Sequence, residues 1–137
     1  MRGLLLDTHV WLWFAEKNDA ITPKIKSLIE QAADSGELFL APISIWEVAM
    51  LTAHQKVTLT LPCLEWVEKS LKHMNMQLVP LSAKIAIESC YLPGLFHGDP
   101  ADRLIVATAR VEDLSLLTKD HKIQRYAATE MLNVIAL

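Results

Sequence analysis

The sequence predicts an α/β fold in which a mainly parallel sheet carries helices on both faces. Short apolar runs alternate with longer segments of helical periodicity along the chain, and this alternation is typical of parallel strands joined by helices. The chain has 137 residues, 52% of them hydrophobic, with only 4 Gly and 6 Pro, which favours short connections. We expect residues 1–137 to form a single domain.

Five short apolar runs are the predicted strands. The first three are each separated from the next run by at least one segment with helical spacing, as right-handed crossover connections require. The last run is expected to be a short fifth strand. The runs cover residues 3–6, 37–41, 77–81, 114–118 and 134–137.

The helical segments are marked by capping residues and by apolar residues on one face. Thr22 before Pro23 is typical of a helix start, and Gly36 is typical of a helix end. Ser44 and Ser82 are each expected to cap a helix. The predicted helices are a segment through Trp11, Trp13 and Phe14, residues 24–35, a helix from Ser44, residues 64–73 with Leu64, Val67, Leu71 and Met74 on one face, a helix from Ser82 to Tyr91, and a helix from Asp99 and Pro100 through Glu112.

Four carboxylates are expected at one edge of this sheet. Asp7 follows the first strand, Glu47 lies early in the helix after the second, Asp102 lies in the first turn of a helix, and Asp120 follows the fourth strand. Open parallel sheets bind ligands at the carboxyl ends of their strands. Because like charges crowded together repel each other, four acids in one cleft indicate a site for a hard divalent cation.

Each of these acids also has a structural explanation. Glu47 completes a Ser-Ile-Trp-Glu capping box, and Asp99 with Asp102 fits a helix start that has an acid in its first turn. Asp7 suits a strand-end turn, and Asp120 suits the cap of the segment that follows it. Taken singly, each acid favours a structural role, but four acids at the same sheet edge favour a metal site.

Four short segments form an ordered set of motifs. They are Leu-Leu-Asp-Thr-His at 5–9, Ile-Trp-Glu-Val at 45–48, Asp-Pro-Ala-Asp-Arg-Leu-Ile-Val-Ala at 99–107 and Leu-Thr-Lys-Asp at 117–120. In this order and spacing they resemble the motifs of PIN-domain ribonucleases, and among those the VapC-type toxins of prokaryotic toxin–antitoxin operons. The resemblance covers essentially the whole chain and implies a three-layer α/β/α sandwich with a central, mainly parallel sheet of about five strands.

The resemblance also implies an activity, namely endonucleolytic cleavage of RNA that depends on Mg²⁺ or Mn²⁺ and leaves 5′-phosphate and 3′-hydroxyl ends. Oxygen ligands suit both ions. We expect Asp7 and Asp102 to bind the metal directly, and Glu47 and Asp120 to bind a second ion or to act through water. The resemblance maps the catalytic acids onto Asp7, Glu47, Asp102 and Asp120, with Thr118 as the hydroxyl that supports Asp120 and with Asp99 as a further supporting residue.

Three partners follow from the resemblance: an RNA substrate, an antitoxin encoded by an adjacent gene, and a second copy of the chain in a homodimer. The net charge of −3 neither indicates nor excludes a nucleic-acid-binding protein. Arg103, Lys119, Lys122 and Arg125 lie beside the acidic motifs in the sequence and are candidate RNA contacts. Solvated surface charge is the alternative for each of them.

The remaining chemistry-bearing residues favour structural roles. Cys63 and Cys90 stand in no metal or redox spacing and are expected to be buried, reduced thiols, and the histidines show no zinc-binding spacing. No apolar stretch is long enough to span a bilayer, so a cytoplasmic protein is expected. The aromatic residues expected in the core or an oligomer interface, rather than as base-stacking platforms, are Trp11, Trp13, Phe14 and Trp46.

Two other functional classes compete with the nuclease. One is a catalytically inert PIN scaffold or regulatory binding module, for which the four acids give no support. The other is a phosphohydrolase with Asp7 as a covalent nucleophile, but such sites usually carry Asp-x-Asp, and position 9 is His. Titration with Mg²⁺ or Mn²⁺ separates a nuclease from an inert scaffold.

Overall fold

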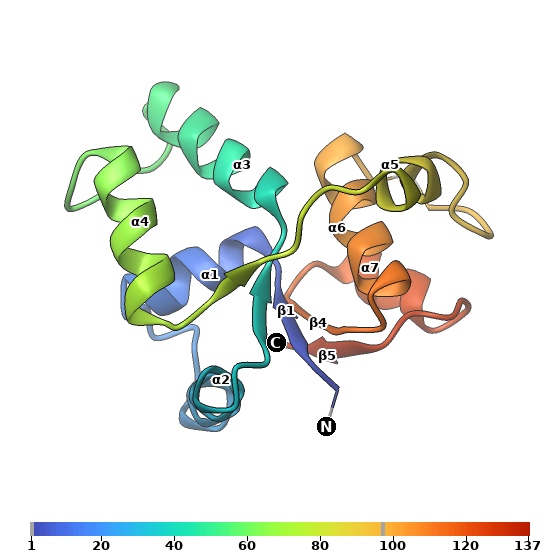
Figure 1. Ribbon diagram of the computed structural model, residues 1–137, viewed down its shortest axis with the longest axis horizontal. Coiled ribbons are helices and arrows are strands. Elements are labelled where there is room, and N and C mark those ends of the chain that lie inside the picture. Colours follow the sequence, from blue (N-terminus) through green and yellow to red (C-terminus); the bar gives the residue numbers. More distant parts are fainter. Residues whose placement is uncertain (1, 97) are drawn as a thin grey trace.

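A computed structural model describes residues 2–96 and 98–137 of the chain (Figure 1). Five strands form one sheet in the order β3-β2-β1-β4-β5, and each neighbouring pair is parallel. The predicted α/β class is confirmed, and the sheet is parallel throughout rather than mainly parallel. The strands are β1 (Leu4–Leu6), β2 (Leu38–Leu40), β3 (Gln77–Leu78), β4 (Ser115–Thr118) and β5 (Val134–Ala136).

Helices connect these strands in the predicted places. One short helix, α7, was not among the predicted helices. In the described part of the chain, no helix has the length and the apolar character needed to cross a membrane. The helices are α1 (Thr8–Ala15), α2 (Pro23–Asp34), α3 (Pro42–Ala53), α4 (Cys63–His73), α5 (Ala83–Cys90), α6 (Pro100–Val111) and α7 (His121–Ala127).

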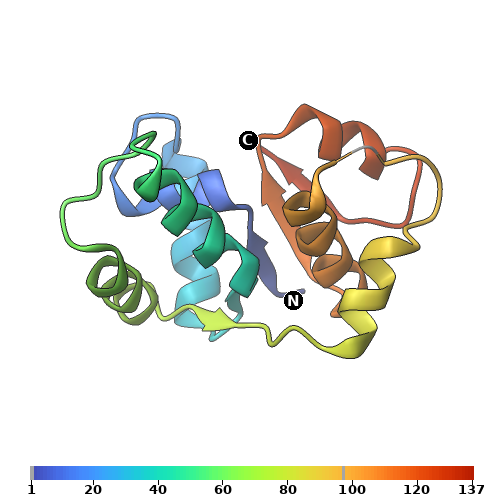
Figure 2. The same cartoon turned by 90° about the horizontal axis from the view of Figure 1, so that it is seen from above.

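The sheet is the middle layer of three. Successive strand residues point to opposite faces, so Leu4 and Leu6 join one core cluster and Leu5 joins the other. Figure 2 shows α1 to α4 on one side of the strands and α5 to α7 on the other. Burial on both faces explains why β1, β2 and β4 are almost entirely apolar, whereas the edge strands β3 and β5 are more exposed.

Several helix boundaries follow from the residues that predicted them. The Thr22 hydroxyl accepts a hydrogen bond from the Ile25 amide at 3.3 Å, with Pro23 at the first helical position of α2. Gly36 ends this helix with a φ of 71°, a conformation that costs glycine no steric strain. The Ser82 hydroxyl caps α5 in the same way as Thr22 caps α2.

Two predictions about helices were wrong. Ser44 is not a cap: α3 begins two residues earlier at Pro42, and Ser44 is fully buried inside the helix. Proline at the first helical position fixes the backbone there without a side-chain cap. Leu64 is 72% exposed in the first turn of α4, so it does not share the buried face of Val67 and Met74.

The expected burial of the cysteines and aromatic residues was only partly correct. Cys90 is exposed and Cys63 is half-buried, so neither is the buried thiol that was predicted. Trp11 is fully buried against Trp66, with ring centroids 5.1 Å apart. Trp13 and Phe14 are half-buried, whereas Trp46 is 55% exposed and lies outside the core.

Candidate active site

The acidic motifs meet where the strand order reverses. From β1 the chain runs outward through β2 and β3, then returns to build β4 and β5 on the other side of β1. Connections that leave β1 and β4 therefore diverge, α1 to one face of the sheet and α7 to the other (Figure 1). Open α/β sheets bind ligands in the crevice that such a divergence creates.

Asp7 lies at the carboxyl end of β1, where it is only 7% exposed. One of its oxygens accepts a hydrogen bond from the Thr118 hydroxyl at 2.6 Å, and the other accepts one from the Thr8 amide at 2.8 Å. Burial raises the pKa of Asp7, and the two hydrogen bonds oppose this rise because they favour the ionised carboxylate. The side chain is thus fixed in one orientation by donors from two elements.

Thr118 bonds to the carboxylate of Asp7 as well as to the backbone of Asp120, the acid that it was predicted to support. Its hydroxyl donates to the carboxylate of Asp7 and accepts a hydrogen bond from the Asp120 backbone amide at 3.0 Å. Thr118 is fully buried at the end of β4, so both partners are held at a fixed distance from the sheet. The hydroxyl therefore links the two central strands on the site side.

Replacing Thr118 by Val removes this hydroxyl while keeping the branched shape of the side chain. We expect the RNA cleavage that the resemblance implies to fall by about 10–100-fold, the usual effect of losing a residue that orients an expected metal ligand. Thr118→Ser keeps the donor and should retain most of the activity. Equal cleavage rates for the Val variant and the wild type would show that Asp7 needs no support from Thr118.

Glu47 reaches the site from the second turn of α3. The Thr8 hydroxyl donates to a Glu47 oxygen at 2.6 Å, and the buried Ser44 hydroxyl lies 2.8 Å from the same Thr8 oxygen. Because α3 starts at Pro42, Glu47 does not close the predicted capping box. Its partner is instead Thr8, the residue after Asp7, so α1 and α3 hold the two acids on the same side of the crevice.

Asp99 and Asp120 confirm their predicted capping roles. Asp99 accepts a hydrogen bond from the Asp102 amide at 2.8 Å at the start of α6, and Asp120 accepts one from the Lys122 amide at 2.8 Å at the start of α7. Asp102 itself lies in the first turn of α6 and is half-buried. Capping therefore explains the positions of Asp99 and Asp120, and Asp7 is likewise the N-cap residue of α1, whereas Asp102 and Glu47 cap no helix.

The carboxyl groups lie close enough together to perturb one another. The pKa of Asp102 is raised to about 7, first by burial and then by the charges of Asp99, Asp7, Asp120 and Glu47. The pKa of Glu47 is also raised, by burial first and then by Asp7 and Asp99, against the Thr8 hydrogen bond. Mutual repulsion of this kind is what a bound cation would relieve.

The donors fit a hard divalent cation in chemistry, although their arrangement is open. Within residues 2–96 and 98–137, no three acidic, histidine or cysteine side chains lie close enough together to hold a metal ion as they stand. All the candidate ligands are carboxylate oxygens, which Mg²⁺ and Mn²⁺ prefer. Mg²⁺ commonly keeps several waters and takes only one or two carboxylates, so a fully assembled protein cage is not needed.

Arg103 is directed away from the crevice. Its guanidinium donates to the carbonyl of Ser89 at 2.8 Å and to the carbonyl of Phe96 at 2.6 Å. These bonds tie α6 to the segment that leads into Asp99. We therefore assign Arg103 to holding that segment rather than to the RNA contact expected from its position beside Asp102.

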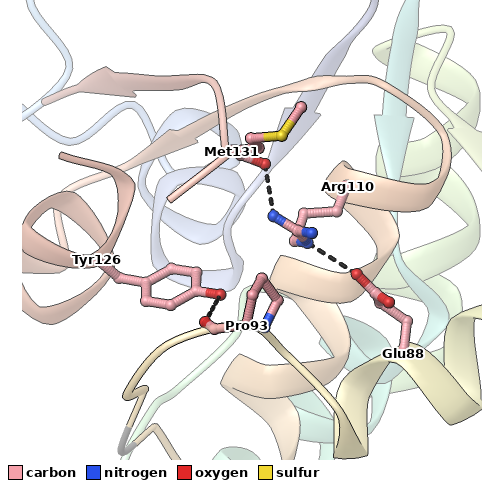
Figure 3. A network of polar contacts seen from close by, with 5 residues as sticks. All are labelled: Glu88, Pro93, Arg110, Tyr126 and Met131. Carbon is pink, nitrogen blue, oxygen red and sulfur yellow. Dashed lines mark hydrogen bonds and ion pairs between the residues drawn. The ribbon is translucent and has the colours of Figure 1, made fainter. Parts of the chain in front are cut away.

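A second set of polar contacts fastens the same segment from the other side (Figure 3). The Tyr126 hydroxyl donates to the Pro93 carbonyl at 2.6 Å. Arg110 bonds to Glu88 at 2.8 Å and to the Met131 carbonyl at 2.7 Å, which joins α5 and α6 to the segment before β5. Tyr126 therefore holds the loop that precedes α6, and Arg110 holds the carboxyl end of that helix.

The other predicted RNA contacts remain at the surface. Lys119, Lys122 and Arg125 are exposed, around the connection from β4 into α7. Lys119 lies over the ring of Trp13, with its nitrogen 4.2 Å from the ring centroid. Of these three residues, only Lys119 has a side-chain contact within the described part of the chain.

Thr8 and Ser44 were missed as site residues. Thr8 stands within the first motif, so its place beside Asp7 was visible in the sequence. The pairing of Thr8 with Ser44 and Glu47 spans 36 and 39 residues, and no local pattern reveals a contact over that separation.

Comparison with known proteins agrees with this geometry. Residues 4–129 match the family model described as PIN domain. The chain is 34% identical over 126 residues to Ribonuclease VapC22 of Mycobacterium tuberculosis, covering 92% of this chain and 93% of that protein. Two solved structures share the fold at 18% identity: VapBC2 from Rickettsia felis bound to a DNA fragment from its promoter, with a TM-score of 0.68 over 97% of both chains, and a toxin–antitoxin complex from Klebsiella pneumoniae, with a TM-score of 0.61 over 98% of this chain and 97% of that one.

The family assignment rests on the sequence comparisons, and the fold is consistent with it. The family model spans nearly the whole chain and includes all four acidic motifs. The three-layer parallel architecture is also that of the two solved structures. The match to the family model and the 34% identity to a VapC ribonuclease over 92% of this chain show that the chain belongs to the PIN-domain family and, within it, to the VapC group.

Proposed function

We propose that the protein is a Mg²⁺- or Mn²⁺-dependent endoribonuclease that acts in the cytoplasm as the toxin of a toxin–antitoxin pair. The observation that carries this proposal is the convergence of Asp7, Glu47, Asp102 and Asp120 at the point where the strand order reverses. The identity to a VapC ribonuclease supports the same reaction class. An inert scaffold has no need to keep repelling carboxylates together.

Asp7 and Asp102 are the residues that would hold the ion, and Glu47 and Asp120 would bind a second ion or orient water. A divalent cation in this position supplies positive charge that activates an attacking water and stabilises the departing 3′-oxygen. Thr118 and Thr8 keep Asp7 and Glu47 oriented through their hydroxyl groups. The described arrangement is open, and Mg²⁺ would complete its coordination with water rather than with a full set of protein ligands.

The test of the nuclease is incubation of the purified protein with total RNA in the presence of Mg²⁺, followed by mapping of the new 5′-phosphate ends. We expect a limited set of cleavage positions that disappear when EDTA replaces the metal. RNA that stays intact with both Mg²⁺ and Mn²⁺ would favour the inert scaffold.

The toxin and its partners form a separable part of the proposal. A cognate antitoxin is supported by the two toxin–antitoxin complexes that share the fold, and a homodimer by the exposed apolar side chains of Ile87, Tyr91 and Leu95 on and after α5. Expression of the protein alone should arrest growth, and co-expression of the small adjacent gene should restore it. Normal growth of the native host with soluble, active protein would remove the toxin role and leave the nuclease.

Glu47→Gln separates the charge of Glu47 from its hydrogen bond. The amide oxygen of Gln can still accept from Thr8, so the contact between α1 and α3 is kept, while one of the repelling charges is lost. We expect unchanged or higher stability of the metal-free protein together with a loss of cleavage of about 10–100-fold. Melting temperature without metal and cleavage rate with metal measure the two halves. Normal cleavage by this variant would reduce Glu47 to a partner of Thr8.

A further inference from the structure

Lys119 is held against the aromatic ring of Trp13 at the edge of the acidic crevice. Its nitrogen lies 4.2 Å from the centroid of the ring, within the range of a cation–π contact. The ring of Trp13 is in turn met by His9, edge to face, with centroids 6.2 Å apart. All three residues follow the two central strands directly, His9 and Trp13 in α1 after β1, and Lys119 after β4.

The position of Lys119 is set by the site itself. The preceding residue is Thr118, whose hydroxyl bonds to Asp7, and the following residue is Asp120. Because its ammonium group lies over Trp13 of α1, the Lys119 side chain bridges the β4–α7 connection and the helix that begins directly after Asp7. His9 is likewise close enough to Asp7 for its charge to act on that carboxylate.

The ammonium group of Lys119 is positioned by Trp13, but no ion pair within the described residues neutralises its charge. Although Asp120 is its neighbour in the chain, the ion pairs found in the described part of the chain do not include Lys119. An exposed lysine with no contact samples many rotamers, whereas a contact with an indole face limits them and leaves the side of the ammonium group that faces away from the ring open to solvent. Such a group is suited to bind an anion beside the acids.

Resting on the proposed nuclease function, we propose that Lys119 binds the phosphate next to the scissile one in single-stranded RNA, with Trp13 as the residue that positions it. A strand whose scissile phosphate lies at the metal site must carry its neighbouring phosphates past the rim of the crevice. Lys122 and Arg125 are exposed on α7 without a described side-chain partner, so they offer charge without a fixed position. Lys119 is the basic residue for which charge, position and proximity coincide.

The experiment measures binding of a short, labelled oligouridylate to the inactive Asp102→Asn protein over a series of salt concentrations. One lost phosphate contact lowers the slope of log affinity against log salt by about 0.7 for a single strand. We expect this change for Lys119→Gln and little change for Lys119→Arg, which keeps the charge and the aromatic contact. Trp13→Leu should weaken binding severalfold, and Trp13→Phe should restore most of it because a ring remains.

Lys26→Gln is the matched control. Lys26 is exposed on α2, which lies beyond the amino ends of the strands (Figure 1), and its loss removes the same charge. An unchanged salt slope for Lys119→Gln, or an equal change for Lys26→Gln, would overturn the proposal. Because binding is measured without cleavage, a salt slope that depends on Lys119 in a protein that never cuts RNA would support the Lys119 site and contradict only the nuclease.

Discussion

Asp102→Asn should reduce metal-dependent RNA cleavage by roughly a thousandfold or more while leaving the protein folded. A cation bound by carboxylates supplies several kcal/mol of stabilisation to the reaction, and about 4 kcal/mol corresponds to three powers of ten in rate. Asn keeps the size of the side chain but removes the charge that would hold the ion. The backbone amide of residue 102 still donates to Asp99, so the start of α6 is preserved.

The matched control is Asp99→Asn, three residues away in the same turn. Asn caps helices as well as Asp does, so this change also removes one negative charge without disturbing the helix. We expect a much smaller loss of cleavage than for Asp102→Asn, because Asp99 is exposed and its side chain caps α6. Full cleavage by Asp102→Asn, measured under single-turnover conditions, would remove Asp102 from the site.

Without metal, the Asp102→Asn protein should be more stable than the wild type at pH values above about 4, and equally stable at lower pH. Asp102 has a folded pKa of about 7 against an ordinary value of 3.8. Below pH ~4 the carboxyl is protonated in both states and has no effect. Between about pH 4 and pH 7 the unfolded chain releases this proton while the folded protein retains it, so the wild type loses stability as the pH rises.

The expected gain for Asp102→Asn at pH 8 is about 1–2 kcal/mol, measured by urea denaturation of the metal-free protein. The half-buried carboxyl remains in contact with solvent, which screens the repulsion and keeps the gain below that of a fully buried group. Saturating Mg²⁺ should make the wild type the more stable of the two proteins, because only the wild type would bind the ion strongly. Binding adds about 2.7 kcal/mol to its free energy of unfolding at a Mg²⁺ concentration a hundred times the dissociation constant. A variant that is no more stable than the wild type at pH 8 would contradict the crowding of the acids.

Local chemistry in the sequence was enough for the architecture. The alternation of apolar runs and capped helical segments predicted every strand and all helices except α7, because burial on both faces of a parallel sheet leaves a continuous apolar signal. Thr22, Ser82 and Asp99 cap helices where expected, since capping depends on residues within one turn. The prediction that Ser44 caps a helix was wrong because α3 begins earlier, at Pro42, and the buried Ser44 hydroxyl bonds to Thr8 instead.

The site was predictable only as far as its acids. Their positions after strands and at helix starts are local features, and the parallel topology then brings them to one edge. The hydrogen-bond partners of the site residues, however, lie far from them in the sequence or in a direction that the sequence does not indicate. Thr118 binds an acid 111 residues away, and Arg103 turns to the carbonyls of Ser89 and Phe96 although it is adjacent to Asp102. Neighbours in sequence do not determine the direction of a long side chain, and only the folded packing does.

The most direct test of a divalent cation site is the binding of Mn²⁺ to the metal-free protein, followed through the electron paramagnetic resonance signal of the unbound ion. We predict saturable binding by the wild type and a loss of that binding in both Asp7→Asn and Asp102→Asn, with Asp99→Asn close to the wild type. Binding of wild-type strength by a protein that carries both the Asp7→Asn and Asp102→Asn changes would contradict the assignment of these carboxylates to the metal.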